Sequence, residues 1–235
     1  MTKLVSLALL LALVGLAALP AAGRNVARAE GIEVRAVSVQ TTFPNGLRFT
    51  ISAGGDGGGL ASVRLRFQIL PAGPLSTVNA QCPEGAIAVC NATLSQPQNY
   101  LAPGAEVRYF WEIEDRAGNR LETEEATATY EDPRFAWQTI SDGNISIHYY
   151  STSANLPETV LRTSRELVDR LSAIQRVSID FPVKVWLYST QGDVQAALQG
   201  NRGRQSPVVT LGQLVSDDVV LVSPDTDGNF LDILR

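Results

Sequence analysis

The sequence is poor in the side chains that most often bind metals or nucleic acids. Among 235 residues there are one histidine, two cysteines and one methionine, and Lys184 is the only lysine after Lys3. Because Lys and Arg do not cluster, neither a groove that follows a phosphate backbone nor a polybasic lipid patch can form. The formal net charge of -5 agrees with this. The composition therefore excludes nucleic acid as a partner.

A long apolar run lies near the start of the chain. Lys3 precedes the run from Leu4 to Leu19, and Ala27-Arg28-Ala29 resembles a small-residue cleavage pattern. We predict that residues 1–29 are a signal peptide and that the protein is exported, to the extracellular space or the cell surface. Removal of this segment leaves 16 basic and 24 acidic side chains, a charge of -8. The alternative is a retained membrane anchor at residues 4–19, a run slightly short for a bilayer span.

The two cysteines lie close together in the chain. Cys82 and Cys90 are separated by seven residues, in a segment rich in Pro, Gly, Ala and Asn. In an exported protein such a pair most often forms a disulfide, here closing a loop of about nine residues. Two thiols without a nearby histidine do not make a zinc centre, which leaves metal binding as the weaker interpretation. We predict a Cys82–Cys90 disulfide.

Short alternating strands occupy residues 30–132. The segment Leu60–Leu70 alternates apolar and polar side chains, as a half-buried strand does. The segment Glu106–Asp132 predicts a hairpin around the turn residues Asp115–Asn119. We expect a mainly β domain, an antiparallel β-sandwich of the immunoglobulin or fibronectin-like class, with Trp111 in its core. An exposed aromatic platform for carbohydrate is the functional alternative for the strand aromatics.

The pattern changes after Asp132, where Pro133 ends the last strand of the predicted sandwich, and we place a domain boundary there. Residues 133–235 then alternate strands and helices, as an α+β domain does. The predicted order is strand Gly143–Tyr150, helix Leu156–Arg176, strand Pro182–Ser189, a short helix ending at Gly200, and strand Asp218–Pro224. The apolar face of the long helix is predicted to contain Leu156, Val160, Leu167, Leu171 and Ile174.

No catalytic set is recognisable, and we assign no catalytic or metal-binding residue. The sole histidine, His148, lies in a predicted strand, where a packing role is more common than catalysis. The paired acids Glu112/Glu114, Glu124/Glu125 and Asp217/Asp218 are expected to lie on solvated faces. In the segment SPDTDGN, residues 223–229, the alternate side-chain oxygens of Asp225, Asp227 and Asn229 resemble those of a calcium loop, but the downstream bidentate Glu is missing. Helix capping is the preferred interpretation.

One family resemblance rests on three segments: FAWQTISDGNISIHYY, FPVKVWLYSTQGDVQAAL and VVLVSPDTDGNFLDILR. Their series resembles the N-terminal half of the peptidase MA-like domain, a gluzincin-type zinc metallopeptidase family of exported bacterial proteins. The resemblance covers about residues 130–235. It implies a zincin-like fold in which the helix opening at NFLDILR continues into H-E-x-x-H, where two histidines on one helical face bind Zn²⁺.

The resemblance implies that zinc is the cofactor of the whole protein and that a peptide or protein is its substrate. The H-E-x-x-H sequence does not occur in these 235 residues, so we expect an N-terminal portion of a metallopeptidase that itself lacks the zinc ligands. Under this hypothesis, the strand Val219–Val222 has a free edge that can hold an extended peptide. The alternative hypothesis is a non-catalytic extracytoplasmic binding or structural module.

Overall fold

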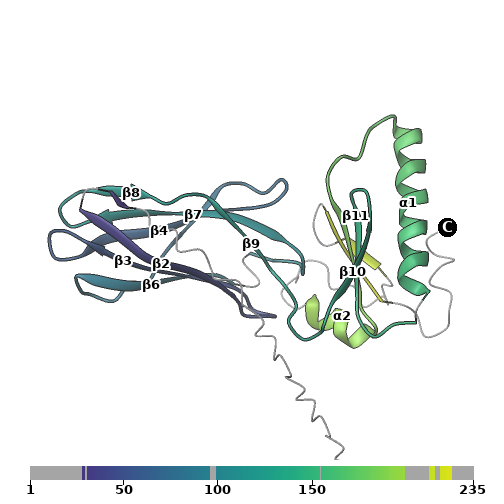
Figure 1. The fold of residues 1–235 in the computed structure, drawn as a ribbon, viewed down its shortest axis with the longest axis horizontal. Helices are drawn as coiled ribbons and strands as arrows, with labels where there is room; N and C mark the ends of the chain where they lie inside the picture. Colours follow the sequence, from purple (N-terminus) through teal and green to yellow (C-terminus); the bar gives the residue numbers. More distant parts are fainter. Residues whose placement is uncertain are drawn as a thin grey trace, which may run out of the picture.

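A computed structural model describes residues 28–29, 31–95, 99–153, 155–198, 212–214 and 218–223. The fold is mainly β, with antiparallel sheets and two helices in the described part. Figure 1 shows the strands β2 to β9 at one end of the molecule and helix α1 at the other, with a second group of strands between them. We call the first group, β1 to β9, the two-sheet unit, and the second group with its helices the mixed-sheet unit.

The N-terminal segment is described only in part. Residues 1–27 of the predicted signal peptide lie outside the described residues. Its last two residues, Arg28–Ala29, form strand β1 and pair with Glu33 and Ile32 of the next strand. None of the helices in the described ranges is long and apolar enough to cross a membrane.

The two-sheet unit contains two antiparallel sheets that share one core. The first sheet has the order β1-β2-β3-β6 and the second the order β5-β4-β7-β8, with β9 also paired to β7. Their bounds are β2 (Ile32–Thr41), β3 (Gly46–Gly55), β6 (Ile87–Ser95), β5 (Ser76–Asn79), β4 (Leu60–Ile69), β7 (Glu106–Asp115), β8 (Arg120–Glu122) and β9 (Ala126–Thr129). Strands β5 and β6 were not predicted from the sequence.

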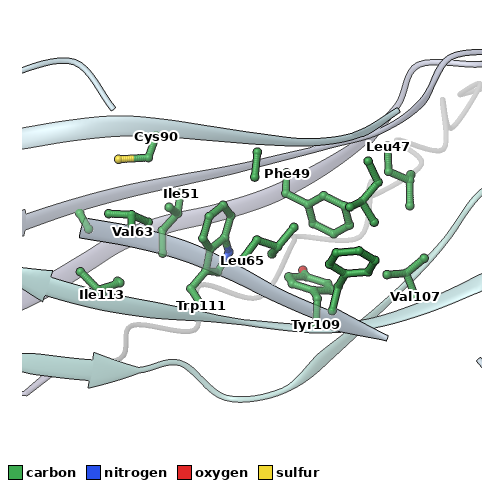
Figure 2. Close-up of a cluster of buried hydrophobic side chains, with 14 of the residues drawn as sticks. Leu47, Phe49, Ile51, Val63, Leu65, Cys90, Val107, Tyr109, Trp111 and Ile113 are labelled. Carbon is green, nitrogen blue, oxygen red and sulfur yellow. The ribbon is translucent and has the colours of Figure 1, made fainter. Parts of the chain in front are cut away.

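Alternate side chains from both sheets fill the space between them. The prediction for Trp111 is confirmed, because its side chain is fully buried and lies among residues of β3, β4 and β7 (Figure 2). Phe49 and Tyr109 meet edge to face across the sheets, with ring centroids 4.9 Å apart. Since Trp111 and Tyr109 are both buried, they offer no aromatic platform to a carbohydrate.

The predicted hairpin has an interrupted second arm. The turn at Asp115 is held by its own carboxylate, which accepts hydrogen bonds from the backbone N–H groups of Ala117 and Asn119 at 3.0 and 2.8 Å. The returning chain pairs with β7 first as β8 and then again as β9. Between β8 and β9, the Thr123 hydroxyl accepts a hydrogen bond from the backbone N–H of Trp111, in place of a backbone carbonyl from a paired strand.

The mixed-sheet unit contains five strands in the order β10-β11-β12-β14-β13. Strands β11, β12 and β14 are parallel, whereas β10 and β13 are antiparallel edge strands. The bounds are β10 (Gln138–Asp142), β11 (Ile145–Tyr149), α1 (Leu156–Gln175), β12 (Val183–Leu187), α2 (Gln191–Ala197), β13 (Gly212–Leu214) and β14 (Val219–Val222). The parallel strands and the helices follow the predicted order, while β10 and β13 were missed.

Pairing of β14 corrects one prediction. The strand Val219–Val222 was expected to have a free edge, but it pairs with β12 on one side and with β13 on the other. Among the described strands, β13 is the edge of the sheet on that side. On this side of the sheet, a peptide could therefore be added only beside Gly212–Leu214 and not beside Val219–Val222.

The two faces of the mixed sheet meet different partners. Ile147, Val185 and Val222 point to one face and pack with α1, which lies against β10 and β11. Trp186, Val219 and Leu221 point to the other face and pack with α2 and with residues of the two-sheet unit. The sheet is thus an inner layer, and its second face forms the joint between the two units.

The predicted apolar face of α1 is partly wrong. Leu156 and Val160 pack on the sheet as expected. In contrast, Leu167, Leu171 and Ile174 are exposed by 39%, 42% and 67%. Leu161 and Val168, on a neighbouring stripe of the helix, pack against the sheet instead. The apolar surface of α1 is therefore wider than the strip that contacts the described part of the sheet.

A disulfide joins Cys82 to Cys90 in the structure. Cys90 lies in β6 and is fully buried in the core, so the bond ties a surface loop to the two-sheet core. Gln81, next to Cys82, pairs with Asn91 through two backbone hydrogen bonds of 2.8 and 2.9 Å. The closed loop therefore folds back along the edge strand that contains Cys90.

We expect reduction of this disulfide to lower the free energy of unfolding by about 2 to 3 kcal/mol, because a loop of about nine residues regains its freedom in the unfolded chain. Urea titrations with and without reductant measure the change. The Cys82→Ala/Cys90→Ala variant is the control, because reductant should leave its midpoint unchanged. Equal midpoints for the native chain in both conditions would contradict a stabilising role.

Candidate functional site

A buried carboxylate lies at the junction of the two units. The Asp132 side chain has no exposed surface and accepts hydrogen bonds from Arg134 Nε at 2.9 Å and Nη2 at 2.6 Å. It also accepts a hydrogen bond of 3.0 Å from the Tyr188 hydroxyl. The backbone oxygen of Asp132 accepts a further bond of 2.8 Å from the Trp137 indole N–H. Asp132 thus connects the linker between the two units, residues 130–137, to the end of β12.

Two partners of Asp132, Arg134 and Tyr188, are held in a fixed environment. The Arg134 guanidinium lies over the rings of Phe43 and Phe135, at 4.7 and 4.9 Å from their centroids. Hydrogen bonding to Asp132 raises the pKa of Arg134. Burial, followed by the nearby Asp132 charge, raises the pKa of Tyr188. The guanidinium and the phenol therefore keep their protons at any physiological pH.

A second carboxylate fixes α2 to the joint. The Tyr150 hydroxyl donates to Asp193 Oδ2 at 2.8 Å, and the Thr190 hydroxyl donates to the same oxygen at 2.6 Å. Burial and the bond to Asp193 raise the pKa of Tyr150 to about 12. The Thr190 hydroxyl also accepts from the Asp193 backbone N–H and so caps the helix.

Aromatic rings fill the space around these carboxylates. Phe135 stacks on Tyr150 with ring centroids 3.8 Å apart and an interplanar angle of 4°. Trp137 meets Trp186 edge to face at 4.6 Å. Further edge contacts link Trp137 to Phe135, Tyr150 and Tyr188. The joint is therefore a packed aromatic cluster with two hydrogen-bonded acids inside it.

Lys184 crosses from the mixed sheet to the two-sheet unit. Its ammonium donates to the Gly104 carbonyl at 3.1 Å and to Glu106 Oε1 at 2.8 Å, and it lies 3.4 Å from Asp218 Oδ2. Asp218 was expected on a solvated face, which is wrong, because its side chain is only 7% exposed and pairs with Lys184. Two hydrogen bonds and one ion pair thus hold the ammonium group at the joint.

A cleft of about 480 Å³ opens beside this joint. Its floor is formed by residues of the mixed sheet, and its walls come from the end of the two-sheet unit and from the linker between the units. The floor residues are Thr139, His148, Lys184 and Trp186, and the wall residues include Gly104, Glu106, Thr129, Glu131, Phe135 and Trp137. The volume suits a small molecule or a few residues of a peptide.

His148 lies in the floor and is neutral. Its ring stacks on Trp186 with centroids 4.6 Å apart, and its two nitrogens lie 3.0 Å from Thr139 Oγ1 and 3.2 Å from Ser146 Oγ. Burial, followed by the positive charge of Lys184, lowers the pKa of His148. Because both nitrogens already have partners, the ring contributes a polar floor rather than a free base.

One buried donor at the cleft lacks an acceptor. Trp186 is 4% exposed, and its indole N–H has no hydrogen-bond partner among the residues that the structure describes. The indole nitrogen lies beside Gly104, where a Cβ atom would approach it to 2.4 Å. Gly104 also has a φ of +84°, a backbone conformation that L side chains rarely adopt. The Gly104 backbone therefore packs directly against the indole, at a place where a larger side chain would not fit.

The fit of the described residues to a zinc site is poor. Cys82 and Cys90 are bonded to each other, and both nitrogens of His148 face hydroxyl groups. Within the described ranges, no three side chains of His, Cys, Asp or Glu lie close enough to hold a metal ion. The calcium-like segment 224–229 lies outside the described residues. A zinc site would need ligands from beyond the part described.

Sequence reasoning identified His148 but missed the cleft. The residues that line the cleft come from β7, β9, the linker, β10, β11 and β12, and they are brought together only by the pairing of the strands. One local signal was available. In strand Val183–Leu187, Lys184 and Trp186 share one face while Val183, Val185 and Leu187 share the other, so the strand presents a lysine and a tryptophan side by side.

We expect Tyr188→Phe to lower the free energy of unfolding by about 1 to 2 kcal/mol, because the buried Asp132 carboxylate loses one of its donors. Tyr149→Phe is the matched control, since the Tyr149 hydroxyl has no hydrogen bond among the described residues, and its effect should stay within about 0.5 kcal/mol. Chemical denaturation of both variants tests the role of Asp132. Equal effects for the two variants would contradict it.

The free energy of unfolding is expected to fall as the pH drops below 6.5. In the unfolded chain His148 takes up a proton near its usual pKa, whereas the folded protein, with a lowered pKa, resists protonation until lower pH. The stabilisation is therefore present above pH 6.5 and is lost as the pH falls through the folded pKa. Urea titrations at several pH values measure the slope, and His148→Asn should flatten it. An unchanged slope in this variant would refute the assignment.

The comparisons with known proteins are sparse. No model of a protein family matches the sequence, and no curated protein matches it either. Two solved structures are distantly similar: a polysaccharide deacetylase from Bacillus cereus, and a protein from Bacillus anthracis described as a polysaccharide deacetylase. Each is 9% identical with a TM-score of 0.32, over 74% and 75% of this chain respectively. The chain spans 57% of the length of either protein, and a likeness this weak carries no argument.

Proposed function

We propose that the described part of this chain is a non-catalytic ligand-binding unit of an exported protein, with the cleft at the joint as its binding site. The observation that carries this proposal is the cleft of about 480 Å³ between the two units, which is lined by the aromatic side chains of Phe135, Trp137 and Trp186 together with polar side chains. Pockets that bind small ligands are usually concave and largely apolar, with a few polar groups that orient the ligand. The apolar surface that a ligand covers in the cleft supplies free energy of binding.

The rigidity of the joint supports binding. The cleft walls belong to different units, yet Asp132 and Lys184 tie those units together through hydrogen bonds and ion pairs. The wall residue Phe135 is stacked on Tyr150 and cannot turn freely. A site whose walls are fixed before the ligand arrives loses little conformational entropy on binding.

For the whole protein we propose a zinc-dependent peptidase of the MA-like kind, in which the described part is the scaffold. The support is the strand order: β11, α1 and β12 form a parallel crossover, and β14 joins the same sheet in parallel. This is the order in which the resemblance places the strands before the zinc helix. In the same proposal, the two-sheet unit is an immunoglobulin or fibronectin-like sandwich and the mixed-sheet unit is the first part of a zincin-like domain.

We expect the purified 235-residue chain to hold less than about 0.1 zinc ions per molecule after dialysis, and to leave unfolded casein intact, because the described residues offer no ligand set. Elemental analysis and a casein assay provide the two measurements. Tight binding of one zinc ion or clear proteolysis would overturn the assignment of a non-catalytic role to this chain.

The peptidase proposal has a separate test in the gene. Reading past the codon for Arg235 should reveal H-E-x-x-H within about ten residues, because the two histidines must follow on the predicted helix. A stop codon, or an extended reading frame without this sequence, would refute the peptidase proposal and leave the binding function standing.

A further inference from the structure

One side of helix α1 is apolar and exposed. Leu171 and Ile174 follow Leu167 after four and seven residues, so the three side chains form one stripe along the helix, and all three are exposed. We call this stripe the exposed flank of α1. Val177 and Phe181, in the segment that follows the helix, are exposed as well. Contiguous apolar surface of this kind marks a contact site, whereas single exposed apolar side chains do not.

The exposed flank faces the middle of the mixed sheet and not its outer edge. Arg165 donates a hydrogen bond from Nε to Asp142 Oδ2 at 3.1 Å, and Asp142 is the last residue of the edge strand β10. Residues two apart on a helix point about 200° apart, so Leu167 lies on the side of α1 away from Arg165. That side is turned toward β12 and β14, which follow β11 in the sheet.

Valine side chains form the part of the sheet that lies beside this flank. Val183 and Val185 of β12 and Val220 and Val222 of β14 point to the α1 side of the sheet, and Val183 and Val220 are only half-buried. The helix itself lies against β10 and β11. Because parallel strands are normally covered on both faces, the valines call for a second layer beside α1. Its place is defined by the valines below and by the exposed flank at the side.

The sequence after β14 has the pattern that such a layer needs. Phe230, Leu231, Ile233 and Leu234 are apolar, and Asp232 is the only charged residue among them. On a helix the four apolar side chains fall within one half of the circumference, and Asp232 points to the opposite side. A helix this short is not stable alone in water, so its apolar face requires a surface to pack on.

The chain is long enough to bring this segment to the exposed flank. Val222 ends β14 level with Tyr149 at the end of β11, which is the end of the sheet where α1 begins. Along the helix axis Leu167 lies about 16 Å from Leu156. The eight residue steps from Val222 to Phe230 span up to about 26 Å when extended. Phe230 can therefore lie beside Leu167.

We infer that residues 230–234 pack as an amphipathic helix between the exposed flank of α1 and the valines of β14. The α1 side of the sheet is then an internal surface that the chain covers with its own downstream segment. This inference does not depend on the proposed binding function, because the cleft lies on the opposite face of the sheet. The competing occupant of the exposed flank is a second copy of the chain.

Photocrosslinking of the full chain tests the contact directly. The variant Phe230→p-benzoylphenylalanine places a photoreactive ring on the apolar side of the segment. The matched control Asp232→p-benzoylphenylalanine places the same ring two residues away, on the opposite side of the predicted helix. An equal mixture of unlabelled chains and chains labelled with a heavy isotope is irradiated, and mass spectrometry of the peptides locates each link and tells links within a chain from links between chains.

The probe at position 230 should form links within one chain to the second half of α1, at least about fivefold more often than the probe at position 232, because only the first faces the exposed flank. Links between unlabelled and labelled chains would show that a second copy covers the flank and would overturn the inference. Links only to other parts of the chain, or equal yields from the two positions, would overturn it as well.

Hydrogen exchange provides an independent measurement. Phe230→Asp should speed amide exchange in the second half of α1 about tenfold, since loss of the packing lets that half open locally. Asp232→Asn should leave the rates unchanged. Leu75→Asp alters another exposed leucine, outside α1, and should also have no effect on these amides. Unchanged exchange in Phe230→Asp would refute the packing of residues 230–234 on α1, while the cleft proposal would be unaffected.

Discussion

The joint depends on the pairing of one buried carboxylate. An unpaired carboxylate inside a protein costs several kcal/mol, so Asp132 can be buried only where two donors converge on it. Arg134 comes from the linker two residues away, but Tyr188 comes from the end of β12. Burial of Asp132 therefore requires the linker to lie against the mixed sheet, and this contact creates the wall of the cleft. The geometry of the cleft follows from the pairing of a single buried charge.

Much of the fold is local and was predictable. Alternating apolar side chains gave the long strands and the central place of Trp111, because a half-buried strand must alternate. The missed strands lack this signal. Strand β10 (Gln138–Asp142) contains a single apolar residue, and β13 (Gly212–Leu214) is three residues long. In β6 the inward positions include alanine and cysteine, so its alternation is weak in hydrophobicity although it is strict in burial.

The site was much harder to predict, because its residues are joined by sheet register and not by spacing in the chain. His148 reaches Trp186 only through the parallel pairing of β11 with β12, and Gly104 meets the same indole across the joint between the units. The same physics explains the partial error in α1. A periodic stripe predicts that a helix has an apolar face, but the position of the sheet decides which part of the face is covered, and Leu171 stays exposed.

Lys184 also holds the two units together. Its ammonium donates hydrogen bonds to Gly104 and Glu106 and forms an ion pair with Asp218, so its charge is already neutralised at the joint. Burial, followed by the charge of Lys184, lowers the pKa of His148 in the floor of the cleft. The walls of the cleft are thus fixed by groups that neutralise one another, because the ion pairs that hold the two units together consume the positive charges of Lys184 and Arg134.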